Sequence, residues 1–167
     1  MPRYIKHDQY GGAWLTLNYD SGAAVTALPV AVAKGLPLKQ QGEFRVASGT
    51  PIPDLGKIKL KATDESGEQR MLHGHITEVA KPLLSAAEVS SRWDSYLFED
   101  GGVLLERSSP IAREVIAVLA RHDVWNRHGI RLYREGNLYN MYVKTGDIVP
   151  MLAPVEAAGD FPRPVKP

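Results

Sequence analysis

The sequence predicts a mainly β protein that ends in a helix and a β-hairpin. Apolar and polar residues alternate in short segments up to about Arg107, with turn residues between the segments. Helical spacing of apolar residues then follows Ser109 and Pro110, and these two residue types favour the cap and first position of a helix. Alternation returns on both sides of Glu135-Gly136-Asn137, a sequence typical of a hairpin turn.

Length and composition limit the classes of protein to consider. The chain has 167 residues, enough for one ordinary domain with a small addition. Its 44% hydrophobic and 23% charged residues are typical of a globular protein with a real core. A net charge of +1 gives no reason to expect a nucleic-acid partner. The chain has no cysteine, which excludes disulfides, thiolate metal sites and cysteine nucleophiles.

The N-terminal stretch "MPRYIKHDQYGGAW" lacks the apolar segment of a secretory signal peptide. The sequence also contains no apolar run long enough for a membrane span. We therefore expect an intracellular protein that has no membrane partner.

Turn residues divide the first part of the chain into short strands. In the segment 56–62, Lys57, Lys59 and Lys61 alternate with apolar residues, which predicts a half-buried strand with a solvated basic face. The segment 81–93 reads as an apolar strand end that runs into a short helix. The further strand candidates are 14–19, 23–36, 42–46, 70–80 and the hairpin 95–107, with Asp100-Gly101 at its tip.

The pattern predicts three parts along the chain. Residues 1–107 form the β-rich domain, and residues 108–149 form a helix-plus-hairpin extension. Apolar residues at helical spacing (Ile111, Val115, Val118, Leu119), followed by His122, predict a helix as far as Gly129. One apolar face favours packing on the chain's own domain over binding a partner. Residues 150–167 form a proline-rich tail that we expect to be extended or disordered.

The stretch "LTLNYDSGAAVTALP" places a single aspartate, Asp20, between two apolar runs. Asp-Ser-Gly is a common tight turn, but apolar flanks on both sides hold this loop between buried strands. A carboxylate in such a place must be hydrogen-bonded, paired or neutralised. Ser21 can donate or accept a hydrogen bond, and Gly22 lets a backbone N–H approach closely. Two carboxylates forced together can share one proton, so that one acts as base and the other as acid.

The "DSGA" motif of residues 20–23 resembles the active-site signature of aspartic proteases of the retroviral and retrotransposon type. Residues 45–60 are similar to the family's flap hairpin, and residues 78–93 are similar to its second signature, which opens a helix. Residues 95–102 fall where the family has a strand after that helix. The resemblance covers about residues 10–107. It implies a retropepsin-like closed β fold with one short helix.

The resemblance implies an aspartic endopeptidase that processes a retroelement polyprotein. The chain has one Asp-Ser-Gly, so the second carboxylate must come from a second copy in a homodimer. Asp20 is the implied catalytic residue, and Ser21 and Gly22 are implied to support the pair of aspartates. Water between the two carboxylates attacks the peptide, with no metal or cofactor. The residues implied to contact an extended peptide substrate are Ala23, Ala47, Ser48, Gly49, Thr50, Leu83, Leu84 and Ser85.

Three residues depart from the family's usual pattern. Asn18 and Tyr19 stand where aliphatic residues are usual, and Ser85 stands where many members have glycine. A second reading is therefore a protease-like domain that does not cut and instead dimerises or holds peptides. A third is an unrelated small β domain in which Asp20 only caps a turn. The extension could lengthen a dimer interface, cover the cleft, or bind another part of a polyprotein.

Other groups of residues favour ordinary structural roles. His73 and His75 share one face of a strand near Glu78, which is half of a metal site at most, and a surface pair is the favoured reading. Ser21 lacks the Gly-x-Ser-x-Gly elbow of a serine nucleophile. The aromatic residues of the extension could form a binding face but commonly cover the edge of a core; they are Trp125, Tyr133, Tyr139 and Tyr142.

Overall fold

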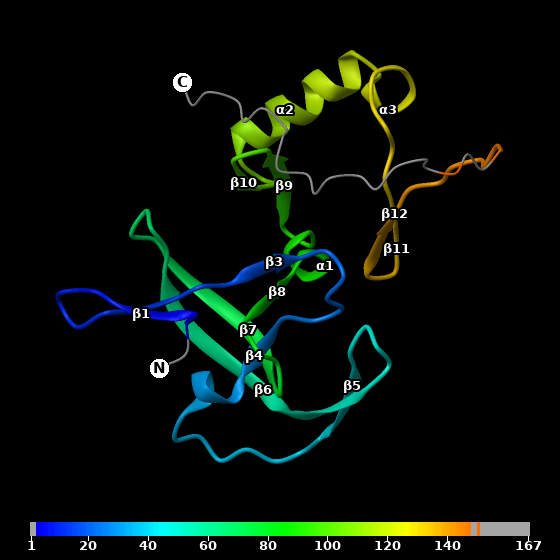
Figure 1. The fold of residues 1–167 in the computed structure, drawn as a ribbon. Coiled ribbons are helices and arrows are strands. Elements are labelled where there is room, and N and C mark those ends of the chain that lie inside the picture. The colour runs from blue at the N-terminus through cyan, green and yellow to red at the C-terminus, as the bar shows by residue number, and fades with distance from the viewer. Residues whose placement is uncertain (1–2, 148–149, 151–167) are drawn as a thin grey trace.

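A computed structural model describes residues 3–147 and 150 of the chain. Within them, a mixed six-stranded sheet curls into a half-barrel, accompanied by three two-stranded ribbons and a few short helices (Figure 1). The predicted mainly β class is confirmed. The strands are β1 (Ile5–His7), β2 (Ala13–Leu15), β3 (Asn18–Asp20), β4 (Ala27–Pro29), β5 (Gly42–Arg45), β6 (Pro51–Thr63), β7 (Gln69–Thr77), β8 (Leu83–Ser85), β9 (Trp93–Phe98), β10 (Gly101–Glu106), β11 (Tyr133–Glu135) and β12 (Leu138–Asn140). The helices are η1 (Val30–Ala33), α1 (Ala86–Val89), α2 (Pro110–Arg121) and α3 (Val124–Arg127).

The order of strands in the half-barrel is β3-β8-β4-β7-β6-β5. β3 runs parallel to β8, and β4 runs antiparallel to β8 and parallel to β7. β3 and β4 are consecutive in sequence, yet β8 lies between them. The loop 21–26 must therefore pass over the end of β8 to reach β4.

β6 and β7 form the long hairpin of the sheet. The exposed lysines Lys57, Lys59 and Lys61 alternate with half-buried residues, as the pattern predicted. β6 begins earlier than the predicted strand, because a bulge between Asp54 and Lys57 lets it continue through the prolines. In the turn 64–68, hydrogen bonds from Ser66 and Arg70 lower the pKa of Asp64 to about 2.

The core lies under β4 and β7. Leu28 and Ile76 are fully buried, and Ala33 of η1 completes the cluster. Gly74 faces this cluster from β7. A Cβ atom at position 74 would lie 3.0 Å from Cδ1 of Leu28, closer than side chains normally approach. The backbone of β7 and the Leu28 side chain are therefore packed so closely that any larger residue at position 74 would require the Leu28 side chain to shift.

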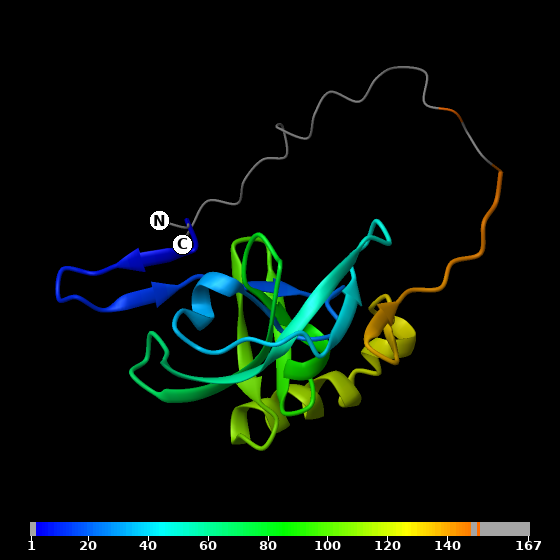
Figure 2. The same ribbon diagram turned by 90° about the horizontal axis from the view of Figure 1, so that it is seen from below.

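The β9–β10 hairpin differs slightly from its predicted form. Gly101 already pairs with Phe98, so the tip consists of Glu99 and Asp100 instead of Asp100 and Gly101. Gly101 ends the turn with φ of +152°, a backbone conformation that glycine adopts more readily than other residues. The hairpin stands apart from the six-stranded sheet, and α2 lies across it (Figures 1 and 2).

The helix predicted to extend to Gly129 is divided in two. α2 ends at Arg121, and Asp123 adopts a left-handed conformation with φ of 47° before α3 begins. Ser109 caps α2 as predicted, accepting a hydrogen bond from the N–H of Ala112. The helix buries a narrower face than the sequence pattern predicted, because Ile111 remains 62% exposed and Ala112 takes the buried position.

The two ends of the described chain form ribbons. β1–β2 projects from the half-barrel in both views (Figures 1 and 2). In its turn, the backbone N–H groups of Gly12 and Tyr10 donate to Asp8 and lower the pKa of that carboxyl. β11–β12 is the predicted final hairpin, with Gly136 at φ of +60°. Apart from residue 150, the predicted tail 150–167 lies outside the described residues.

Across residues 3–147, every helix is too short, or too polar, to cross a membrane.

The close approach at Gly74 makes a testable prediction. Gly74→Ala should lower the free energy of unfolding by about 1–3 kcal/mol, because the added methyl group must displace Leu28. Gly42→Ala in β5 is the matched control, since no atom lies within 4 Å of the added methyl group. Urea denaturation measures both variants. Equal stability of the two variants would contradict the packing described here.

Candidate active site

Asp20 is the last residue of β3 and lies opposite Ser85, the last residue of β8. The parallel pairing places Asn18 opposite Leu83 and Tyr19 opposite Leu84. The strand that ends at the DSGA motif and the strand within residues 78–93 thus lie side by side. Asp20 is half-buried at the point where the chain leaves the sheet.

The Asp20 carboxylate accepts a hydrogen bond within its own loop. The backbone N–H of Gly22 donates to Oδ1 of Asp20 over 2.8 Å. This is the contact expected for Gly22, although ordinary Asx turns contain the same bond. Ser21 and Gly22 are both exposed, whereas Ala23 is half-buried. The distinction between a plain turn and a site depends on what holds the loop from beneath.

Ser85 lies directly beneath this loop. Its side chain is fully buried, and its hydroxyl donates to the carbonyl oxygen of Ala23 over 2.7 Å. The Ser85 hydroxyl oxygen also accepts a hydrogen bond from the backbone N–H of Glu88 at 3.3 Å and so caps α1. Ser85 is among the residues that the resemblance implies contact the substrate. In this structure it lies on the inner side of the loop, where its hydroxyl satisfies a buried carbonyl and a helix end together.

Thr26 and Glu88 complete the support, and the sequence analysis did not identify either. The N–H of Ser85 donates to Oγ1 of Thr26 at 3.1 Å. The N–H of Thr26 donates to Oε2 of Glu88 at 3.2 Å. The sequence Ser85-Ala86-Ala87-Glu88 has the spacing of a capping box, in which glutamate returns to the N–H of the cap residue. Here the N–H of Ser85 donates to the Thr26 hydroxyl instead. The Glu88 carboxylate accepts the N–H of Thr26 and so supports the loop 21–26.

The segment expected to act as a flap is a hairpin turn. Val46 and Thr50 face each other, with a hydrogen bond of 3.1 Å from the N–H of Val46 to the carbonyl of Thr50. Gly49 has φ of +83°, which explains the glycine. Residues 47–50 are exposed. The turn rises on the side of the sheet where loop 21–26 lies (Figure 1), but we find no hydrogen bond between them in the described part of the chain.

The remaining predicted substrate contacts, Leu83 and Leu84, are half-buried in β8. Tyr19, one of the departures from the family pattern, has a structural role: its hydroxyl hydrogen-bonds to that of Ser95 in β9. This bond ties the strand that carries Asp20 to the β9–β10 hairpin.

Two surface pockets lie away from the Asp20 carboxylate. One, of about 460 Å³, lies among Arg92, Arg107 and Arg113 near the start of α2. The other, of about 420 Å³, is lined by Arg3, Asn18 and other residues near the N-terminal arm. Neither pocket is lined by Asp20 or by the β5–β6 turn.

The two histidines of β7 lie in different surroundings. His73 is exposed, whereas Nδ1 of His75 lies 3.1 Å from Oδ2 of Asp54. The ring of Phe44 packs edge-on against the His75 ring at 5.1 Å. Among the described residues, no three histidine, aspartate or glutamate side chains gather as metal ligands would.

Comparisons of the chain with protein-family models, curated proteins and solved structures found no match.

The Ser85 hydroxyl is the central support of the loop and can be tested by its removal. Ser85→Ala should lower the free energy of unfolding by about 2 kcal/mol, because a buried carbonyl and a helix end each lose a partner. Ser91→Ala is the matched control, since it removes an exposed hydroxyl whose one hydrogen bond within the described residues is to the Glu88 carbonyl. Chemical denaturation measures both. A loss below about 0.5 kcal/mol for Ser85→Ala would contradict the role given to it.

Proposed function

We propose that the protein is an aspartic endopeptidase that acts as a homodimer, with one Asp20 from each copy. The observation that carries this proposal is the support, from beneath, of the loop 21–26 that follows Asp20. We call residues 20–26 the Asp20 loop. Ser85, Thr26 and Glu88 fix the loop through buried or half-buried hydrogen bonds. Within the described residues, the Asp20 carboxylate itself receives a hydrogen bond only from Gly22. Its second oxygen is thus available to water and to another carboxylate.

The reaction needs two carboxylates that share one proton. The ionised carboxylate takes a proton from a water molecule, and the water oxygen bonds to the carbonyl carbon of the peptide. The protonated carboxyl gives its proton to the carbonyl oxygen, which forms a tetrahedral diol. The carboxyl that took the proton from water then gives it to the nitrogen, and the C–N bond breaks. The other carboxylate takes a proton from one hydroxyl of the diol, which leaves a carboxylic acid and an amine and restores the pair. This route uses no metal and no covalent intermediate.

The rest of the proposal follows the family resemblance. We propose that the half-barrel is a retropepsin-like fold and that residues 47–50 close over an extended peptide. Ala23, Leu83 and Leu84 are half-buried beside the loop, so apolar side chains are favoured around the cut. The natural substrate is a retroelement polyprotein. The two-fold arrangement requires the second Asp20 because each chain contains one Asp-Ser-Gly.

Cleavage of a peptide library tests this function. The wild-type protein should cut, with a rate that rises more than linearly with protein concentration, because two copies form each site. Asp20→Asn should lower the rate by about 10²–10⁴-fold, since the amide cannot act as a base. Asp100→Asn, at the exposed tip of the β9–β10 hairpin, is the matched control and should cut like the wild type. Mass spectrometry identifies the cuts at acidic and neutral pH.

Three results would argue against the proposal in different ways. A folded dimer without cuts would favour a protease-like module that holds peptides. A folded monomer without cuts would leave Asp20 as a turn residue. Cuts that persist in Asp20→Asn would assign the activity to other residues or to a contaminant.

A further inference from the structure

The β11–β12 ribbon (residues 133–140) lies close to the Asp20 loop. At its turn, the side-chain amide of Asn137 donates to the carbonyl oxygen of Ala24 over 3.4 Å. Ala24 is part of the loop 21–26, so the ribbon touches the segment that carries the proposed catalytic residue. Figure 1 shows the ribbon returning from α3 to the level of β3 and α1, although the two are far apart in sequence.

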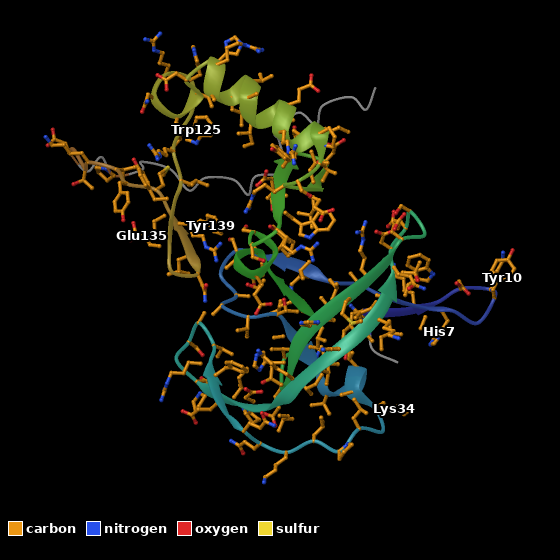
Figure 3. The ribbon with its side chains drawn as sticks, turned by 180° about the vertical axis from the view of Figure 1, so that it is seen from behind. His7, Tyr10, Lys34, Trp125, Glu135 and Tyr139 are labelled. Atoms are coloured by element: carbon orange, nitrogen blue, oxygen red, sulfur yellow. The ribbon has the colours of Figure 1, made fainter. Side chains whose placement is uncertain are left out.

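A second contact fixes the same ribbon to the support beneath the loop. The hydroxyl of Tyr139 donates to Oγ of Ser90 over 2.5 Å. Ser90 is the C-cap residue of α1, the helix that Ser85 begins. Figure 3 shows Tyr139 on the ribbon next to α1. Both anchors of the ribbon are thus attached to the elements that position Asp20.

The ribbon is held by little else. Among the described residues, we find no other hydrogen bond and no ion pair between residues 130–143 and the rest of the chain. Leu138 is 52% exposed, and neighbouring apolar residues are exposed as well. A two-stranded ribbon alone is only marginally stable in water. The two side-chain hydrogen bonds therefore hold the ribbon in place without a buried apolar interface.

The connection between α3 and the ribbon has no regular structure. Residues 128–132 contain no helix or strand, and Ile130 and Leu132 are strongly exposed. The internal contacts of the ribbon do not involve the body of the protein. Tyr133 and Tyr142 pack edge-on at 5.6 Å, and the Tyr142 hydroxyl bonds to Glu135. Within the described residues, release of the ribbon from the Asp20 loop would break two side-chain hydrogen bonds and leave these internal contacts intact.

We propose that the β11–β12 ribbon is an autoinhibitory cover, which keeps the Asp20 loop of one copy from meeting that of another. The inference rests on the proposed function, because it requires that two Asp20 loops approach each other. A ribbon seated on Ala24 occupies space beside the loop. The second copy must compete with a segment of the same chain, whose effective concentration is high. Dimer formation and release of the ribbon are then coupled.

The first experiment releases the cover. The double variant Asn137→Ala, Tyr139→Phe removes both hydrogen bonds that seat the ribbon on the Asp20 loop and on α1. It should strengthen dimer formation about tenfold, because these two modest bonds no longer favour the form in which the ribbon covers the loop. Tyr133→Phe is the matched control, since we find no hydrogen bond to its hydroxyl among the described residues. Sedimentation equilibrium measures dimer formation, and hydrogen exchange of residues 133–140 reports the release. Unchanged or weakened dimer formation in the double variant would overturn the proposal.

The second experiment locks the cover. The natural chain has no cysteine, so Ala24→Cys with Asn137→Cys provides a single pair of thiols for a short, reducible cross-linker. The intramolecularly linked form should remain monomeric, and reduction should restore dimer formation in the same polypeptide. A linked protein that dimerises as well as the reduced one would exclude a covering role.

The two proposals can fail separately. If the double variant dimerises more strongly than the wild type but neither of them cuts peptides, the covering role of the ribbon is supported and the protease assignment fails. If the wild type cuts through Asp20 and release changes neither dimer formation nor rate, the protease stands and the cover fails.

Discussion

The position of β8 between β3 and β4 is the constraint on which the candidate site depends. Two strands that are consecutive in sequence are held apart by a third, so the backbone between them must cross the end of that third strand. The crossing brings the backbone of residues 21–26 over Ser85, where polar groups are buried and must find partners. Asp20, the last residue of β3, stands immediately before this crossing.

A small network satisfies the buried groups of this crossing. Ser85 and Thr26 each donate and accept, and Glu88 receives the N–H of Thr26. Networks in which each member has partners are rigid, because the loss of one bond leaves a buried group unpaired. The rigidity comes from residues on the inner side of the loop. The outer side, which carries the Asp20 carboxylate, is left open for chemistry or for contact with another segment.

The sequence predicted the parts of this structure that local patterns determine. Alternation in 56–62, the cap at Ser109 and the turn at Gly136 depend on neighbouring residues and were confirmed. The break at Asp123 was not predicted, because a left-handed residue other than glycine leaves little trace in an apolar pattern. The inner position of Ser85 and the role of Thr26 could not be predicted either. Both depend on β8 entering between two other strands, and that pairing joins distant parts of the chain.

The position of β8 between β3 and β4 also affects the order in which parts of the half-barrel fold. The five residues 64–68 connect β6 to β7, so this hairpin closes a short loop and can form early. The bond between Ser85 and Thr26 joins residues 59 positions apart, and closing that loop carries a larger entropy cost. We expect the segment around Asp20 to be the last part of the half-barrel to assemble.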